Sequence, residues 1–544
     1  MSGFPGKPFL TKDFSSRGGG VDFLGLRLVN LNMVGHYLIP EINNQTQDMG
    51  TFCLGAWMPW KFMELCRSKA DCTEPNYRRF REKVEVAMSQ TFHVSTSVDA
   101  KVGPTRNRVG ITQKIKLPSK LTFNNAGRKS GNSIYSAAIY GPSIRYLGLI
   151  DSYTILADDG FTPIRVPKHS DDDGTMKIVE TVDAALEQTS AFKRLASLDS
   201  ETMSQKDVES LSECGLNPAY WRLPRYKALK EVFRQKLLPD DASAPGYGRT
   251  LTTKLVLATV KKRKITSWEL RTAWFTGMYD DGKPLLITDA ELEEQKNRWS
   301  LFLARQYQRY AIETFLYCFE IALKNGCRSI EAVVDFWLKG PNAKKVVWQT
   351  TFDEILLAEA KKITGSRDDD TISHAWNEKV HPGHSSFEEP DDLDQYLASP
   401  CLPACQLLAK WFWRMLVRVK QDKNRTIVRL GDSDRMSMAW FIDWLQARRS
   451  LPLEAFLKDV FSDLVFAQHM RVALSRFDGQ AQRLRFMLSD RGIEPAIGAR
   501  NIGEMRPPWM PDRLDTLINL LEDTEVLVRS ANDELGAGDA ASEI

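Results

Sequence analysis

The sequence lacks the features that would assign it directly to a class. Its 544 residues include only eight cysteines, too few and too scattered for the disulfide framework of a small secreted domain. We therefore expect a reduced, cytoplasmic protein. No uncharged apolar run approaches roughly 20 residues, so no membrane span is predicted. The Gly- and Ser-rich residues 1–20 have no apolar core, so we expect no signal peptide but a flexible lead-in.

An overall charge of one sign is also missing. The formal net charge is only +3, so an argument for nucleic-acid binding has to be local. Neither a phosphate-binding GxxxxGK[ST] motif nor a GxSxG nucleophile elbow occurs, and no repeat has a fixed period. We therefore predict a non-catalytic chain without a cofactor.

The sequence does contain many apolar residues spaced at the period of an α-helix. Hydrophobic residues make up 43% of the chain, and its 14 Trp indicate thick cores and buried interfaces. Helical spacing is found in 21–40, where Pro40 would end the helix, and in 49–63 around Pro59. From about residue 180 the helical pattern is nearly continuous, and 297–326 is expected to be a central core helix ending at Gly326.

A pattern of alternating apolar and polar residues, typical of β-strands, interrupts the predicted helices near the N-terminus. Val109, Ile111, Ile115 and Leu117 alternate with polar or Gly neighbours, which predicts two or three short strands within 101–130. A small strand-and-turn element is predicted at 151–167. The fold class is therefore mainly α, a multi-helix body with a small N-terminal winged-helix-like α+β region. The expected divisions are 1–20 lead-in, 21–180 winged-helix-like domain, 181–365 helical domain, 366–395 acidic mobile loop, 396–530 C-terminal helical domain and 531–544 frayed tail.

The most informative local signal is a basic window within 101–130. It contains no Asp or Glu but many cations mixed with Asn, Thr and Ser, the side chains that position a protein on a phosphate backbone. The alternative is a solvated basic surface. The predicted nucleic-acid contacts here are Lys101, Arg106, Arg108, Lys114, Lys116, Lys120, Arg128 and Lys129.

A second basic run, KKRKITSWELR, occupies 261–271. A capping box at Thr266–Glu269 predicts a helix directly after the cations, with Trp268, Leu270 and Trp274 facing inward and Arg271 outward. Cations at a helix start oppose the helix dipole, so local stability does not explain them. Because the first turns contain no Asn or Gln, phosphate positioning is favoured over base reading. The predicted contacts are Lys261, Lys262, Arg263, Lys264 and Arg271.

Other clusters have weaker patterns. The loop histidines His374, His381 and His384 match no zinc spacing. Asp353, Glu359 and Lys361 are the residue types found in the active site of one class of metal-dependent nuclease. That active site needs the residues on two neighbouring strands, whereas here all three lie in one predicted helix. The arginines of 471–491 are expected to pair mostly with carboxylates of the chain itself; they are Arg471, Arg476, Arg483, Arg485 and Arg491.

One stretch, LIPEINNQTQDMGTFCLGAWMPWKF at 38–62, resembles a pattern in uncharacterised helical proteins of bacterial anti-phage defence islands. The residues that carry this resemblance are Pro40, Asn43, Asn44, Thr46, Phe52, Pro59 and Trp60. The resemblance covers about 25 residues and includes no catalytic one. It implies an accessory subunit of a multi-gene defence system such as Druantia or Zorya, working beside a helicase or a nuclease.

Together these features predict a non-catalytic DNA-binding or scaffold subunit of a bacterial anti-phage defence complex, with DNA and protein partners and no membrane. Two alternatives stay open. One is a metal-dependent nuclease whose carboxylates come together only in the fold. The other is a protein–protein scaffold whose basic surface meets an acidic partner.

Overall fold

The protein is mainly helical, as predicted, and its strands are short and form two-stranded sheets. None of the described helices is both long and apolar enough to cross a membrane. The computed structural model describes residues 22–44, 46, 48–66, 71–95, 120–122, 140–152, 155–156, 163–164, 168–198, 202–211, 226–340, 350–362, 364–372, 400–422, 426–477, 484–504, 507 and 510–544.

The chain folds into two compact units, and each is assembled from two separate stretches. Unit 1 comprises the described residues of Met1–Met33 and Trp268–Met510, and unit 2 those of Val34–Ser267 and Pro511–Ile544. The division after Met33 falls inside the region 21–180 that the sequence suggested as one domain. The expected boundaries near 180, 365 and 395 do not separate the two units.

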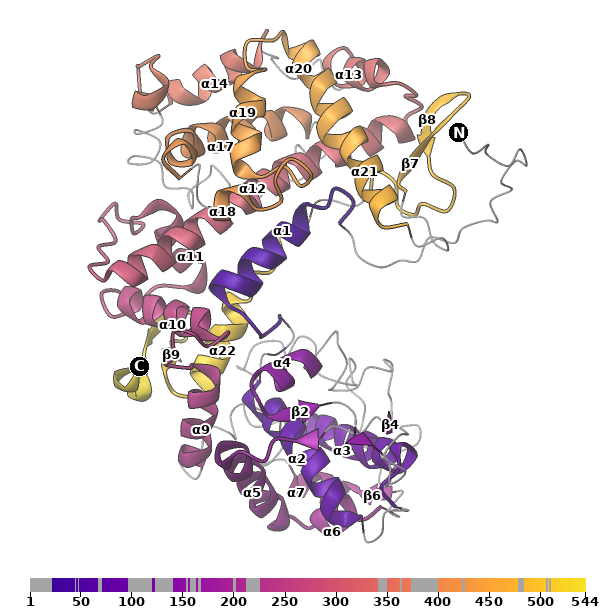
Figure 1. Ribbon diagram of the computed structural model, residues 1–544, viewed down its shortest axis with the longest axis vertical. Coiled ribbons are helices and arrows are strands. Elements are labelled where there is room, and N and C mark those ends of the chain that lie inside the picture. Colours follow the sequence, from indigo (N-terminus) through magenta and orange to yellow (C-terminus); the bar gives the residue numbers. More distant parts are fainter. Residues whose placement is uncertain are drawn as a thin grey trace, which may run out of the picture. The chain divides into compact units, whose positions relative to one another are not determined.

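Unit 2 is organised around α2 (Met49–Leu65), which packs against α5 (Asp173–Glu187) (Figure 1). Asp48 caps α2 by accepting the N–H groups of Gly50 and Thr51 at 3.1 and 3.0 Å. Pro59 lies within the helix. The other helices of unit 2 are the π-helix η1 (Val34–Leu38), α3 (Glu74–Ser95), α4 (Gly141–Tyr146), α6 (Phe192–Leu195), α7 (Gln205–Ser210), α9 (Lys227–Leu237), α10 (Tyr247–Val260), α22 (Leu514–Asp523) and the 3-10 helix η6 (Asp539–Glu543).

The strands of unit 2 confirm one expectation, and the other lies mostly outside the described residues. The strand-and-turn element at 151–167 is a hairpin of β3 (Ile155–Leu156) and β4 (Pro163–Ile164). Within 101–130, the described residues are β1 (Lys120–Thr122), which pairs with β6 (Thr202–Ser204) far along the chain. The remaining strand pairs are β2 (Ile150–Ser152) with β5 (Lys168–His169) and β9 (Leu527–Arg529) with β10 (Leu535–Ala537).

The C-terminal residues are packed, and the expectation of a frayed tail is wrong. β10 lies within 531–544 and pairs antiparallel with β9, while Ala540 and Ala541 of η6 are buried. A three-residue strand is too short to give a clear alternation in the sequence, which explains the error.

Unit 1 is built around α12 (Ala290–Lys324), the predicted central core helix. It begins earlier than expected, and its cap is Asp289, which accepts the N–H groups of Glu291 and Leu292. α17 (Cys401–Asp422) lies along α12 (Figure 1). The other elements of unit 1 are α1 (Leu26–Met33), α11 (Ser267–Thr276), α13 (Ile330–Leu338), α14 (Phe352–Lys361), α18 (Thr426–Arg429), α19 (Met438–Gln446), α20 (Leu453–Asp459), the π-helix η5 (Val460–Ala467), α21 (Gln468–Ser475) and the hairpin β7 (Phe486–Ser489) with β8 (Gly492–Pro495).

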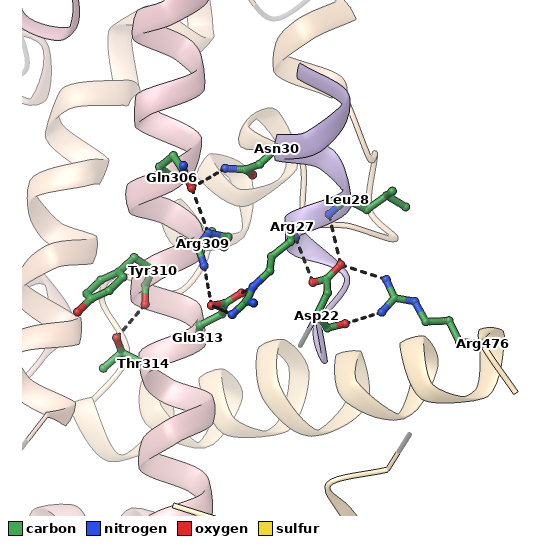
Figure 2. A network of polar contacts seen from close by, with 10 residues as sticks. All are labelled: Asp22, Arg27, Leu28, Asn30, Gln306, Arg309, Tyr310, Glu313, Thr314 and Arg476. Atoms are coloured by element: carbon green, nitrogen blue, oxygen red, sulfur yellow. Dashed lines mark hydrogen bonds and ion pairs between the residues drawn. The ribbon is translucent and has the colours of Figure 1, made fainter. Parts of the chain in front are cut away.

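A buried polar network fastens α1 to α12 (Figure 2). Arg27 makes two hydrogen bonds to Glu313, from Nε to Oε1 and from Nη2 to Oε2, both 3.0 Å long. Arg309 donates to the same carboxylate at 2.6 Å. One turn away, Asn30 donates to Gln306 at 2.9 Å. One carboxylate of α12 thus balances two guanidinium groups, one from each helix.

A buried histidine holds the chain just before α1. The backbone N–H of Arg485 donates to His469 Nε2 at 2.9 Å, so the ring proton sits on Nδ1 and is donated to the carbonyl of Phe23 at 3.1 Å. Burial, together with the charge of Arg485, lowers the pKa of His469 to about 4. A second ring proton would face the Arg485 N–H, so this contact requires neutral imidazole.

Replacing Glu313 by Gln should lower the free energy of unfolding by about 3 kcal/mol, because the buried Arg309 and the partly buried Arg27 then lose the carboxylate that both contact. The matched control is Glu331→Gln. Its ion pair with Lys458 has the same 2.6 Å length as Arg309–Glu313, but both side chains are more than half exposed. Urea unfolding of both variants measures the difference; equal losses would contradict the role assigned to the network.

Acidification should weaken the wild-type protein more than a His469→Gln variant. The folded-state pKa of His469 lies below the ordinary 6.5, so the unfolded chain takes up the proton first as the pH falls. Stability from this site is present above pH 6.5 and is lost towards pH 4. Between pH 7 and pH 4.5 the wild type should lose roughly 2 kcal/mol more than the variant. Parallel pH profiles from denaturant unfolding would disprove this.

Candidate nucleic-acid interface

The basic run of 261–264 forms an exposed loop in unit 2, directly after α10. All four of its side chains are exposed. Lys261 is the C-cap residue of α10, and its N–H donates to the carbonyl of Leu257 at 2.9 Å. The chain then turns and continues to Ile265. The cations therefore form one contiguous exposed group; they are Lys261, Lys262, Arg263 and Lys264.

The helix before the loop changes the electrostatic expectation for these cations. The sequence pattern showed only the helix after the cations, whose dipole they oppose. In the structure they also follow the C-terminus of α10, where the helix dipole favours positive charge. The loop therefore has a local stabilising role, and binding to a partner is not needed to explain its charge.

The loop is held in place by the C-terminal segment of the chain. Ile265 forms an antiparallel bridge with Leu535 of β10, whose N–H donates to the Ile265 carbonyl at 2.8 Å. Both side chains are buried. The Lys264 side chain passes Gly536, where an added Cβ would lie 3.9 Å from its Cε. The loop is thus attached at one end to α10 and at the other to β10.

Acidic residues of the C-terminal segment are engaged by other cations. Arg529 pairs with Glu522 at 3.0 Å and with Asp533 at 2.6 Å. Lys230 of α9 pairs with Glu525 at 2.5 Å, and Arg234 pairs with Glu543. Within the described ranges, neither Lys261 nor Lys264 has a carboxylate partner. The C-terminal segment therefore fixes the loop without neutralising these two lysines.

The residues of KKRKITSWELR from Trp268 onward belong to unit 1, and two expectations about them are wrong. α11 begins at Ser267, which makes Thr266 its N-cap residue as predicted. Arg271 is only 7% exposed and Trp268 is 41% exposed, whereas Arg271 was expected outside and Trp268 inside. The reason is that α11 is surrounded on all sides, since every residue from Leu270 to Thr276 is buried. A buried Arg271 offers no surface to a phosphate.

The basic window of 101–130 lies almost entirely outside the described residues. This holds for Lys101, Arg106, Arg108, Lys114, Lys116, Arg128 and Lys129, whose predicted contacts stay predictions. Lys120 begins β1, where its backbone is in register with Ser204 of β6. The structure does not bring this window together with the loop of 261–264 in any described contact.

The nuclease pattern is not assembled. Asp353, Glu359 and Lys361 all lie on α14, as expected from their spacing. The Asp353 carboxylate accepts from Arg449 at 2.6 Å, and Glu359 accepts from Lys362 at 2.7 Å. Among the described residues, no group of three or more His, Cys, Asp or Glu side chains is arranged to hold a metal ion. His374, His381 and His384 lie outside those residues.

Two arginines of the series 471–491 pair inside the chain, as predicted. Arg485 makes a bidentate contact with Glu320 at 2.6 and 2.7 Å, and Arg476 contacts Asp22 at 3.0 Å. The sequence reasoning missed the contribution of the C-terminal segment to the site. A signal for it was present: the apolar Leu527 and Leu535 flank the turn-forming residues 530–533.

Leu535→Ala should loosen the basic loop and speed its cleavage by trypsin. Removing a fully buried leucine side chain costs about 2–5 kcal/mol, and here the loss falls on the strand that anchors Ile265. Val528→Ala is the matched control, because Val528 lies on the partner strand and is half exposed. Mass spectrometry of limited digests would show the cut sites; equal cleavage after 261–264 in both variants would contradict the anchoring.

Comparison of the chain with protein-family models, curated proteins and solved structures finds no match. A function for this chain therefore has to be argued from its own residues, and the exposed loop of 261–264 is the feature of the described surface with the clearest chemical preference.

Proposed function

We propose that this chain is a non-catalytic subunit that binds DNA by its phosphate backbone, with the loop of 261–264 as one contact. The observation that carries the proposal is a run of four exposed cations on a loop fixed at both ends. Its lysines at 261 and 264 lack an acidic partner among the described residues. Such a surface attracts a polyanion such as DNA. When the lysines and arginine contact the phosphates, the cations condensed on the DNA are released, which favours binding.

Geometry favours positioning over base reading. A turn between a helix C-terminus and a bridge presents side chains on flexible stems, whereas base readout uses a helix or ribbon inserted into a groove. Lys254 lies two turns before Lys261 on the partly exposed face of α10, which extends the positive surface along the helix. Contacts of this kind add affinity with little dependence on sequence.

The finer parts of the proposal rest on the sequence. The basic window of 101–130 supplies a second contact, and its winged-helix-like setting is supported by helices α2 and α3 preceding the hairpin β3–β4. The resemblance of 38–62 suggests a bacterial anti-phage defence complex in the cytoplasm, with a helicase or nuclease as protein partner. In the structure most of that stretch is buried in and around α2. The resemblance therefore concerns core residues and does not indicate a shared binding surface.

The loop contact is tested by reversing the charge of Lys261 and Lys264 together. Binding of a labelled duplex, measured across a salt series with Mg²⁺ present, should weaken. The slope of log affinity against log salt should fall by about 0.9 for each phosphate that the protein no longer neutralises. The matched control reverses Lys177 and Lys193, which are exposed on α5 and α6 of the same unit. That control should keep the wild-type slope.

Each other outcome points to a different function. No binding by the wild type at low salt would sink the proposal and leave the protein–protein scaffold, whose basic loop would meet an acidic partner. Cut DNA would favour the nuclease alternative, and sensitivity to a chelator would confirm a metal dependence. Equal losses in both charge-reversed variants would mean that net charge alone governs binding. Reversing Lys114, Lys116 and Lys120 tests the second contact in the same assay.

A further inference from the structure

Lys264, Gly536 and Val528 form a row across the basic loop, β10 and β9 of unit 2. Val528 of β9 is in register with Gly536 of β10. Ile265 forms an antiparallel bridge with Leu535. In an antiparallel pair, the preceding residue of one segment lies opposite the following residue of the other, so Lys264 lies opposite Gly536. The row therefore has a lysine at one end, a valine at the other and no side chain in the middle.

The Lys264 side chain occupies space beside Gly536. A Cβ added to the glycine would lie 3.9 Å from Cε of Lys264 and 3.6 Å from Cγ2 of Val528. Lys264 is exposed and Val528 is 51% exposed, whereas the glycine between them is buried. The apolar stem of the lysine therefore helps to cover the glycine, while its ammonium group reaches solvent.

The backbone does not require a glycine at position 536. Gly536 is not among the described glycines with a positive φ, and glycine is disfavoured in strands. Apart from its chain neighbours, the only described atoms within 4 Å of the added Cβ belong to the side chains of Lys264 and Val528. A Cβ at Gly538 would instead collide with the carbonyl oxygen of Glu525. Gly536 thus leaves space for side chains, and Gly538 leaves space for the backbone.

We propose that Gly536 is a positioning residue for DNA binding, because it leaves room for the Lys264 stem and so holds the ammonium group ready for a phosphate. A lysine side chain loses conformational freedom when it binds, and a stem that already lies against the sheet loses less at that step. Among the flexible side chains of the loop, Lys264 is therefore partly ordered in advance. This inference rests on the proposed DNA contact of the loop of 261–264.

The competing explanation is that Gly536 only helps β9 and β10 to pair. A larger residue would then change the protein in the same way whether or not Lys264 is present. If the glycine acts through the lysine, its effect on DNA affinity should disappear once the lysine is removed. The two explanations therefore differ in a double-mutant cycle.

The test is the affinity of full-length variants for a labelled duplex at one low salt concentration. Gly536→Thr adds γ atoms beyond a Cβ that already contacts Lys264, so it should displace the stem and weaken binding about fivefold. Gly536→Ala is the matched control, because its Cβ lies at ordinary contact distances and should leave the affinity unchanged. In a Lys264→Ala background, Gly536→Thr should change the affinity less than about twofold.

The order of the Lys264 side chain gives a readout that needs no DNA. NMR relaxation of ¹³C-labelled lysine, with the signal assigned through Lys264→Arg, reports the motion of its Cε group in the free protein. That group should be more ordered in the wild type and in Gly536→Ala than in Gly536→Thr. A merely structural role for the glycine would not change the motion of this one side chain.

Three results would overturn the inference while DNA binding by the loop stands. They are equal affinities of the wild type and Gly536→Thr, an equal loss with and without the lysine, and a Lys264 signal as mobile in the wild type as in Gly536→Thr. Absence of duplex binding by the wild type at low salt is a different failure. It would reject the proposed DNA contact itself, and with it any role of Gly536 in that contact.

Discussion

The packing of unit 1 depends on the buried charged side chains of its central helix, α12. A guanidinium group loses several kcal/mol of hydration when it is buried, and that loss has to be offset by close partners. Arg309 is offset by Glu313, whose Oε2 also accepts from Nη2 of Arg27 in α1, while its Oε1 accepts from Nε of Arg27. Arg309 and Glu313 lie one turn apart on α12, whereas Arg27 lies on α1. The position of α1 along α12 is therefore set by charge pairing as well as by apolar contact.

The buried charge of Arg305 is stabilised without a hydrogen bond to a carboxylate. It is fully buried and donates to the carbonyls of Arg435 and Met436 in the loop before α19. Burial and the nearby Arg309 lower the pKa of Arg305 to about 9, so it stays charged at neutral pH. Gln308 donates to the same Met436 carbonyl at 2.8 Å. These bonds fix a loop in which Met436 adopts a positive φ of 51°, a conformation that a methionine rarely takes unaided.

Buried arginines bound to carbonyls recur, and this affects how the basic residues of the chain are interpreted. Arg249 donates to the carbonyls of Leu237 and Pro40, and Arg414 donates to that of Phe275 at the end of α11. Such arginines organise loops and helix ends and are unavailable to a ligand. Arg271 was expected at the surface because a helical pattern was read as having one exposed face, but every residue of α11 from Leu270 to Thr276 is buried. Lys261 and Lys264 differ because they are exposed and, within the described residues, have no carboxylate partner.

The sequence predicted elements whose signal is local and failed where the decisive contact is distant. α2 and α12 have long apolar periodicities, and the paired strands β3 and β4 lie close together in the sequence, so all were predicted. The pairing of β1 with β6 and of Ile265 with Leu535 joins residues far apart in sequence. No local pattern specifies such a partner. The basic loop was located correctly, but its support from the C-terminus could not be foreseen.

These distant contacts share a consequence for assembly. Each unit is completed by a terminal segment: α1 joins α12 in unit 1, and α22 with β9 and β10 joins unit 2. Contacts between distant residues form late because a long loop must close first. Ile265 therefore gains its bridge to Leu535 only after the chain has been made as far as Leu535. The loop of 261–264 acquires its fixed position at the same step, so the proposed DNA contact depends on the pairing of β9 and β10.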